Sequence, residues 1–423
     1  MTTVLILFAL LSLLLAGVPV AFALGGLGLG LLLSDQLSPL MIPMGLYSAF
    51  DNFVLLAVPL FLLMSNILLK GGIGKDLFNA VQSWVGHWPG GLGVATILSC
   101  TIFSAISGSS VATAATIGSV AIKEMTDRGY HRPFVLGLLA AGGTLGILIP
   151  PSIPMIVYGV ITEESIVDLF LAGVGPGLLM AGSFILFCFI YARFSSSYQP
   201  IPKADRQTRI NSSLLALPTI GLATVIIGGI YAGIFTPTES AAIGVAVSLI
   251  IVCAMGRFSV EKMKAATIET MKTTITIFLI IAGAKIFGKA ITLYQIPQEI
   301  SMIVSETISD PGFFILVVCL VLLLMGFFLE SISMLLIMVP VLYPSLQALG
   351  IDPIWFGVLF VIMIECALIT PPVGLNLFVI QAVSNGKITE VVQGVWPFFL
   401  IMLCCLVAVF YVPAIAIYLP FNL

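Results

Sequence analysis

Two proline pairs stand in apolar stretches where membrane-spanning helices are expected, and small polar residues accompany both. Pro150-Pro151 lies in the stretch 142–154, and Pro371-Pro372 lies in the stretch 369–376. Proline lacks an N–H, so carbonyl groups one turn before each pair lose their helical hydrogen bonds. Such carbonyls persist inside a membrane only where protein, water or a cation satisfies them. We therefore predict two broken helices whose free carbonyl and hydroxyl oxygens suit a small hard cation such as Na⁺.

Two polar interruptions, 107–110 and 330–333, each separate a pair of short apolar arms. The first reads Ser-Gly-Ser-Ser within 91–125, and the second reads Glu-Ser-Ile-Ser within 313–349. Polar backbone at membrane depth has to be enclosed by protein or to line a cavity. A polar tip between arms that stop partway across therefore predicts one re-entrant hairpin in each half of the chain.

The two tips and the two breaks are expected to meet near the middle of the bilayer. Helix N-termini and hydroxyl groups suit a carboxylate, whereas carbonyl groups at helix breaks suit Na⁺. The predicted substrate-binding residues are Ser107, Ser109, Ser110, Ser331, Ser333 and Asn376. The predicted Na⁺ ligands are Ser107, Gly108, Gly143, Thr144, Gly146, Pro150, Glu330, Thr370, Val373 and Gly374. Glycine and serine also serve close packing between membrane helices, but a proline pair repeated in both halves favours the functional interpretation.

Isolated charges in the apolar stretches are open to structural and functional interpretations. Glu330 is either a functional intramembrane acid or the cap of the helix that follows it. Glu239 stands in the first turn of a predicted helix, where a carboxylate is favourable, so a structural role is preferred. Glu365 has no evident partner and is either a buried, hydrogen-bonded or protonated acid or part of the transport machinery. Lys285 and Lys289, one turn apart, are expected to extend toward a membrane interface.

The composition is that of a polytopic, all-α membrane protein. Of 423 residues, 60% are hydrophobic and 8% are charged, whereas soluble domains carry roughly 25% charged residues. The apolar N-terminus has no basic segment or cleavage site, so we interpret it as a retained helix. The seven cysteines lack metal-binding spacing, and a net charge of −3 without a basic patch gives no sign of nucleic-acid binding. No cofactor is expected beyond the coupling ion Na⁺.

The two halves repeat each other with inverted orientation. The proline pairs lie 221 positions apart, and Gly129 and Gly350 keep the same offset. Ala16-Gly17-Val18-Pro19 resembles 232–237, which favours two short helices in 1–34. Basic connectors, among them 193–209 and 257–272, are expected on the cytoplasmic side, and acidic loops without Lys or Arg on the outside.

These assignments define the predicted domains. The first repeat covers 1–192, a cytoplasmic connector covers 193–211, and the second repeat covers 212–423. Each repeat contains scaffold helices (about 1–69 and 212–294), a hairpin (about 91–125 and 313–349) and a broken helix (about 134–160 and 354–382). We expect the hairpins and broken helices to move as one unit against the scaffold. Such a movement keeps the binding site enclosed by protein, so that a bound charge is not exposed to lipid.

Several motifs resemble the large membrane (M, DctM-like) subunit of tripartite ATP-independent periplasmic (TRAP) transporters. The resemblance runs along essentially the whole chain, through 57–61, 107–109, 146–152, 235–242 and 370–376. It implies an elevator-type, Na⁺-coupled importer in a bacterial inner membrane. It also implies a separate small four-helix membrane subunit and a periplasmic solute-binding protein. Family substrates include C4-dicarboxylates, sialic acid, other sugar acids and zwitterions such as ectoine.

Four alternative functions compete with this interpretation. A purely scaffolding role is disfavoured, because a scaffold does not need broken helices in the middle of the membrane. An ion or anion channel requires a continuous polar pore, which isolated polar tips between apolar arms do not provide. An intramembrane hydrolase requires a metal set or paired acids, and no HExxH or matched pair of intramembrane Asp residues occurs, so the chain is not expected to be an enzyme. A transporter that works without a binding protein remains an alternative.

Overall fold

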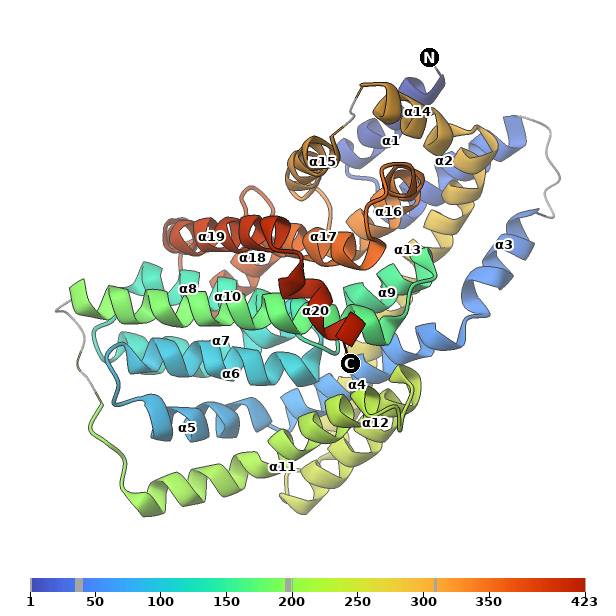
Figure 1. Ribbon diagram of the computed structural model, residues 1–423. Helices are drawn as coiled ribbons and strands as arrows, with labels where there is room; N and C mark the ends of the chain where they lie inside the picture. Colours follow the sequence, from blue (N-terminus) through green and yellow to red (C-terminus); the bar gives the residue numbers. More distant parts are fainter. Residues whose placement is uncertain (1, 35–40, 195–198, 200, 308–309, 423) are drawn as a thin grey trace.

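The computed structural model describes residues 2–34, 41–194, 199, 201–307 and 310–422. Across these residues the chain forms twenty α-helices, one short 3₁₀ helix and no strand (Figure 1). Eight helical stretches among them are long and apolar enough to cross a membrane. The prediction of an all-α polytopic membrane protein is therefore confirmed.

The first half of the chain ends with one long helix after a series of shorter ones. A turn at Gly17, whose φ of +80° favours glycine, separates the first two helices and confirms that 1–34 is not continuous. The elements are α1 (Thr2–Leu15), α2 (Val20–Ser34), α3 (Met41–Phe50), η1 (Phe53–Leu56), α4 (Ala57–Lys70), α5 (Ile73–Val85), α6 (Gly91–Ser107), α7 (Ser110–Thr126), α8 (Arg132–Leu148), α9 (Ile153–Thr162) and α10 (Ile166–Phe194).

The second half follows the same order of hairpin, broken helix and long helix. Glu239 closes a capping box with Thr236 at the start of its second helix, which confirms a structural role for this acid. The elements are α11 (Arg206–Tyr231), α12 (Pro237–Ala254), α13 (Val260–Leu293), α14 (Ile296–Thr307), α15 (Pro311–Met325), α16 (Ser331–Ala348), α17 (Pro353–Leu368), α18 (Leu375–Ser384), α19 (Ile388–Tyr411) and α20 (Ala414–Asn422).

Four stretches depart from the prediction. The interpretation of 257–272 as a connector was wrong beyond its first residues, because α13 runs unbroken from Val260 to Leu293. The acidic loop predicted after this helix is largely helical, as α14, and α5 was not predicted at all. These segments mix polar and apolar residues on opposite helix faces, so they contain no apolar run long enough to mark a span. The predicted span from residue 47 to 69 is divided among α3, η1 and α4.

Contacts between helices occur in matched pairs, as expected for two repeats. Helix α2 packs on α13, and α4 packs on α12; α7 packs on α18, and α9 packs on α16. Helix α8 lies against α19 in the way that α10 lies against α17. The outer helices are paired in the same way. Helix α5 packs on α11, and the Thr3 hydroxyl of α1 donates to the Glu299 carboxylate of α14.

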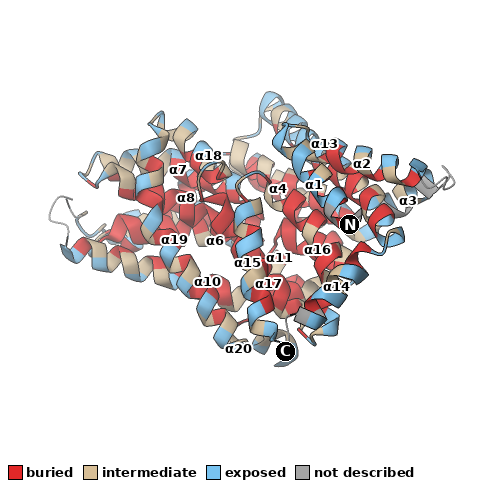
Figure 2. Ribbon diagram, turned by 90° about the horizontal axis from the view of Figure 1, so that it is seen from above, coloured by how far each residue is buried: buried red, intermediate tan, exposed pale blue. Residues whose placement is uncertain are grey.

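The broken helix of the first half forms the centre of the molecule. In its most apolar window within Arg132–Thr162, 89% of the residues are buried, compared with 39% in Ile166–Phe194. Figure 2 shows the buried residues concentrated along α6, α8 and α17. The peripheral helices keep apolar faces exposed, which fits contact with lipid or with another membrane protein.

Candidate substrate and cation site

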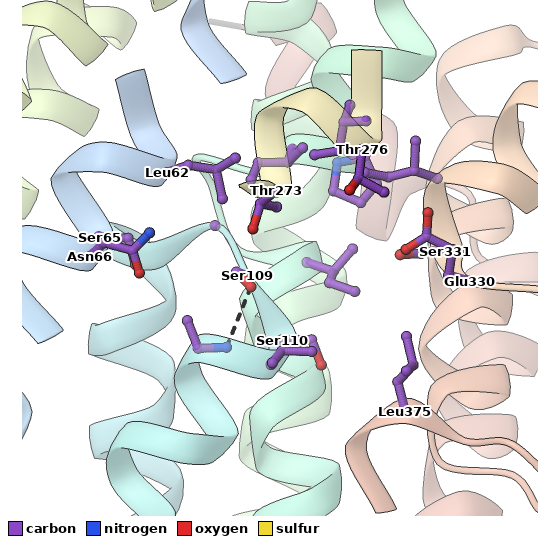
Figure 3. Close-up of a pocket in the computed structure, with 18 of the residues that line it drawn as sticks. Leu62, Ser65, Asn66, Ser109, Ser110, Thr273, Thr276, Glu330, Ser331 and Leu375 are labelled. Carbon is purple, nitrogen blue, oxygen red and sulfur yellow. Dashed lines mark hydrogen bonds between the residues drawn. The ribbon is translucent and has the colours of Figure 1, made fainter. Parts of the chain in front are cut away.

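A cavity of about 590 Å³ separates the hairpin tips from two scaffold helices, α4 and α13; we call it the tip cavity. Figure 3 shows Ser109 and Ser110 of the first hairpin on one side and Glu330 and Ser331 of the second hairpin on another. Helices α4 and α13 close the remaining sides, with Asn66 among the residues they contribute. Both predicted hairpins are thus present, and the structure brings their tips to one cavity.

The first hairpin tip is built for close approach to the first helix break. Helix α6 ends at Ser107, and Gly108 adopts a φ of +58° that favours glycine. A Cβ at Gly108 would lie 2.6 Å from the Pro151 carbonyl oxygen. Ser109 then caps α7 by accepting a 3.4 Å hydrogen bond from the Ala112 N–H. The tip therefore rests on the break through backbone contact that a larger residue would prevent.

Behind the tip, hydroxyl groups form a buried cluster. The Ser107 and Thr113 hydroxyl oxygens are 2.8 Å apart, and Thr113 also donates to the Ser109 carbonyl at 2.9 Å. Gly146 of α8 packs so closely that a Cβ there would lie 2.8 Å from the same Ser109 carbonyl oxygen. Ser107 and Gly146, both predicted site residues, thus lie immediately behind the cavity wall and hold the tip in position.

The first break separates α8 from α9 around a cis Pro150–Pro151 bond. Prolines at these positions leave the Gly146 and Ile147 carbonyls without their usual helical donors. Thr144 donates its hydroxyl proton to the Ala141 carbonyl at 2.8 Å, so its oxygen lone pairs remain free for a cation. Thr144 does not line the tip cavity, and neither do the other two predicted ligands of this break: Pro150 is buried at the break, and Gly143 packs on Ala114 of α7.

The second break repeats this arrangement between α17 and α18. Its Pro371–Pro372 bond is also cis, and Thr370 donates its hydroxyl proton to the Cys366 carbonyl at 2.5 Å. Gly374 precedes α18 with a φ of +36°, and with Val373 it borders a small pocket shared with Ser331. The Leu368 carbonyl loses its helical donor because the residue four positions later is Pro372.

Asn376 is fully buried and joins the two halves of the site. Its side-chain oxygen accepts a 2.7 Å hydrogen bond from the Ser110 hydroxyl, and its amide donates to the Ala140 carbonyl at 3.0 Å. Asn376 therefore fixes the N-terminus of α18 against the first hairpin and α8. Its side chain belongs to the wall of the site, whereas Ser110 reaches the cavity itself.

Glu330 faces the tip cavity from the second hairpin (Figure 3). Its side chain makes no capping hydrogen bond to the start of α16. It accepts instead a 3.3 Å hydrogen bond from the buried Ser333 hydroxyl. The structure thus shows no capping bond for Glu330 and places its side chain at the cavity, and a functional role for this acid stays a prediction. Glu365, by contrast, lies fully buried in α17, with neither carboxyl oxygen hydrogen-bonded to a described residue.

The ends of several half-helices converge on the tip cavity. The first residues of four helices line it: Ser110 of α7, Ile153 of α9, Ser331 of α16 and Leu375 of α18. Each such end carries partial positive charge and unpaired N–H groups, which attract anions. The C-terminal residues Ile147 of α8 and Leu368 of α17 line the same cavity, and such ends present carbonyl oxygens to a cation. The arrangement suits a carboxylate and a cation bound side by side.

The scaffold residues of the cavity were missed by reasoning from sequence. Ser65 and Asn66 come from α4, and the α13 residues are Glu269, Lys272, Thr273, Thr276 and Ile277. Asn66 donates to the Thr270 hydroxyl at 2.9 Å, and the Glu269 carboxylate pairs with Lys70 at 2.6 Å. The recurrence of polar residues one turn apart at 269, 272–273 and 276 was the available signal. This signal was missed because the stretch was divided between a predicted connector, up to residue 272, and a predicted span from about residue 275.

Comparison with known proteins places the chain among membrane transporters. A family model described as "Tripartite ATP-independent periplasmic transporter, DctM component" matches residues 6–415. The C4-dicarboxylate TRAP transporter large permease protein DctM of Pseudomonas aeruginosa is 41% identical over 89% of this chain and 88% of its own length. The sialic acid TRAP transporter large permease protein SiaM of Vibrio cholerae is 36% identical over 98% of this chain and 97% of its own length.

A solved structure shares the fold. The YdaH transporter of Alcanivorax borkumensis superposes with a TM-score of 0.61, covering 90% of this chain and 87% of that protein, at 15% identity. At that identity the likeness concerns the arrangement of helices and not the substrate.

Proposed function

Because the chain belongs to the DctM component family of tripartite ATP-independent periplasmic transporters, we propose that it imports a small organic acid with Na⁺ across a bacterial inner membrane. The observation that carries this proposal is the convergence of four helix N-termini and two helix C-termini on one cavity. Partial positive charge and partial negative charge at one site favour joint binding of an anion and a cation. Joint binding is the physical basis of symport.

The proposed substrate is a carboxylate such as a C4-dicarboxylate, sialic acid or a related sugar acid. The hydroxyls of Ser109, Ser110 and Ser331, with the Lys272 ammonium of the scaffold, provide donors for carboxylate oxygens. Relatives of similar identity are named for a C4-dicarboxylate and for sialic acid, so overall likeness does not decide between these acids. Selection is proposed to rest largely on the periplasmic binding protein that delivers the substrate.

The proposed mechanism is an elevator. The tip cavity lies where the hairpins and broken helices meet α4 and α13, so the site borders a junction between two packed bodies. Moving the hairpin unit as a whole along the scaffold keeps bound charge enclosed by protein. A separate small four-helix membrane subunit is proposed to brace the scaffold, whose outer helices expose apolar residues toward lipid or that partner.

Uptake into proteoliposomes tests the function. The chain would be reconstituted with its small subunit, supplied with binding protein outside, and offered radiolabelled succinate or sialic acid under an inward Na⁺ or K⁺ gradient. We expect saturable uptake that requires both Na⁺ and the binding protein. Saturable uptake driven by Na⁺ alone would support the transporter without a binding protein. Uptake that is indifferent to both, with linear dependence on substrate, would support the channel and overturn symport.

Cross-linking tests the elevator separately. Helices α4 and α7 are in contact beside the tip cavity, so cysteine pairs that join them fix the hairpin unit to the scaffold. We expect such a pair to retain substrate binding and to stop net uptake, with recovery after reduction. Undiminished uptake by a quantitatively cross-linked pair would refute the elevator and favour local movement of the hairpins.

A further inference from the structure

A second cavity, of about 630 Å³, opens between the scaffold and the hairpin unit; we call it the lysine cavity. Lys285, Lys289 and Thr292 of α13 line one side, and Pro340 and Tyr343 of α16 line the other. Both lysines are exposed, and their extension toward a membrane interface stays a prediction. They also border a space that is about as large as the tip cavity and that lies between the two bodies.

Within the described parts of the chain, Lys285 and Lys289 lack ion pairs of the kind that Lys70 and Arg257 form, and they share this with Lys262, Lys264 and Lys272 of the same helix. Lys70 pairs with Glu269 at 2.6 Å, and Arg257 pairs with Asp76. Neither Lys285 nor Lys289 has a carboxylate within 4.0 Å among the residues that the structure describes. Since like charges four positions apart on a helix repel each other, an anion between these ammonium groups would be stabilising.

The neutral hydroxyl groups of the lysine cavity already donate to backbone carbonyls. The Thr292 hydroxyl donates to the Gly288 carbonyl at 2.7 Å, so the two lysine ammonium groups are the donors that an anion would meet along α13. Tyr343 donates to the Thr162 carbonyl at 3.2 Å and lies 3.4 Å from the Glu164 carboxylate. The negative charge of Glu164 would repel an anion on the α16 side of the cavity. The anion is therefore expected to lie against α13.

The two cavities lie at different levels along the same helices. Helix α13 contributes residues centred on Thr273 to the tip cavity and on Gly288 to the lysine cavity. These centres are fifteen residues apart, about 22 Å along the axis at ~1.5 Å per residue. Helices α9 and α16 begin at the tip cavity, with Ile153 and Ser331, and reach the lysine cavity one to three turns later. A solute at either cavity therefore meets the same moving helices.

We propose that Lys285 and Lys289 form an anion-receiving site for the carboxylate of the organic acid, at the end of α13 away from the tip cavity. This inference rests on the proposed function, because it assigns the site to the arriving substrate. By the distribution of basic connectors, that end of α13 faces the outside. The phosphate of an anionic lipid has the same chemistry as a rival occupant, and the experiment separates the two.

A cysteine at Thr292 reports on the site without any transport measurement. The full-length chain would be reconstituted with Cys253, Cys319 and Cys404 replaced by serine, because these three are the cysteines that are not buried. Labelling rates would be compared for an anionic and a cationic methanethiosulfonate reagent of similar size. Leu293→Cys is the matched control, since Leu293 is the next residue and does not line the cavity.

We expect the anionic reagent to be favoured at Thr292→Cys and not at Leu293→Cys. Lys285→Gln with Lys289→Gln should lower the anionic-to-cationic rate ratio about tenfold, the scale on which clustered charge concentrates small ions. Lys285→Arg with Lys289→Arg should retain the ratio, which separates lost charge from altered folding. Failure of Thr292→Cys to react, or a ratio unchanged by the glutamine pair, would overturn the proposal.

Succinate and lipid composition distinguish the occupants. In phosphatidylcholine vesicles, millimolar succinate should slow labelling of Thr292→Cys at least threefold, and this protection should vanish in the glutamine pair. Protection by added phosphatidylglycerol with none by succinate would assign the site to lipid and overturn the proposal. The labelling needs neither Na⁺ nor binding protein, so it succeeds or fails independently of symport. Conversely, Na⁺-coupled uptake with an unchanged KM for the organic acid in the glutamine pair would refute this inference and leave the proposed symport intact.

Discussion

The hydrogen bond from Ser110 to Asn376 joins residues that are 266 positions apart, and replacing Asn376 tests how firmly it ties the two halves together. Asn376→Ala removes this 2.7 Å bond and the 3.0 Å bond to the Ala140 carbonyl. Each neutral hydrogen bond contributes about 1 kcal/mol net, and a buried group left unpaired adds a further ~1–3 kcal/mol. Ser110 lines the tip cavity, so its freed hydroxyl can turn to water and avoid that penalty. We therefore expect a loss of about 2 kcal/mol in the free energy of unfolding.

A double-mutant cycle separates this pair from its surroundings. Ser110→Ala, Asn376→Ala and the double variant would be unfolded with SDS and followed by tryptophan fluorescence. The coupling energy of the two side chains should be about 1 kcal/mol, since one direct hydrogen bond joins them. Asn211→Ala is the control, because exposed Asn211 accepts a 3.0 Å hydrogen bond from Gln207 and should change stability by less than ~0.5 kcal/mol. Additive losses in the cycle would refute the assigned link between the hairpin and α18.

Three further predictions concern the cation, the acid and the topology. Thr144→Ala and Thr370→Ala should raise the Na⁺ concentration for half-maximal uptake several-fold while the protein still assembles, because backbone carbonyls remain; an unchanged Na⁺ curve in both would exclude these hydroxyls as ligands. Glu330→Gln, which keeps the side-chain shape and the contact with the second hairpin, should weaken Na⁺ dependence more than it lowers expression, measured as uptake per protein in the membrane. An impermeant thiol reagent outside cells should label Asn422→Cys and not Lys203→Cys, and the opposite result would reverse the assigned orientation.

The broken helices and hairpins could be predicted because their causes are local. Pro150-Pro151 and Pro371-Pro372 remove helical donors wherever the chain places them, and helices α8 and α17 end before them as expected. The tips at 107–110 and 330–333 could be predicted from composition alone, because each is a short polar segment between two apolar arms. The repeat could be predicted for the same reason. The equal spacing between matching motifs of the two halves can be recognised in the sequence without any knowledge of packing.

Amphipathic helices were harder to predict because their stability depends on what covers their apolar face. Helix α5 packs on α6 and α11, and α14 packs on α16. No local sequence pattern predicts these contacts. The basic stretch at the start of α13 has the charge of a connector, yet tertiary contacts of Ala266 and Thr270 with α4 keep it helical. Sequence periodicity is weak evidence for such helices, since their neighbours supply most of the stabilisation.

Residue type and chain order by themselves determined that this is a membrane protein with two repeated halves, each carrying a polar tip and a broken helix, and the inverted orientation of the halves stays a prediction. Only the tertiary structure decided which polar groups share one cavity. Asn66 and Thr273 became site residues because α4 and α13 pass the tips, and Asn376 became a wall residue because α18 docks on Ser110. Contacts between residues hundreds of positions apart depend on how whole helices pack, and residue spacing along the chain carries no direct record of that packing.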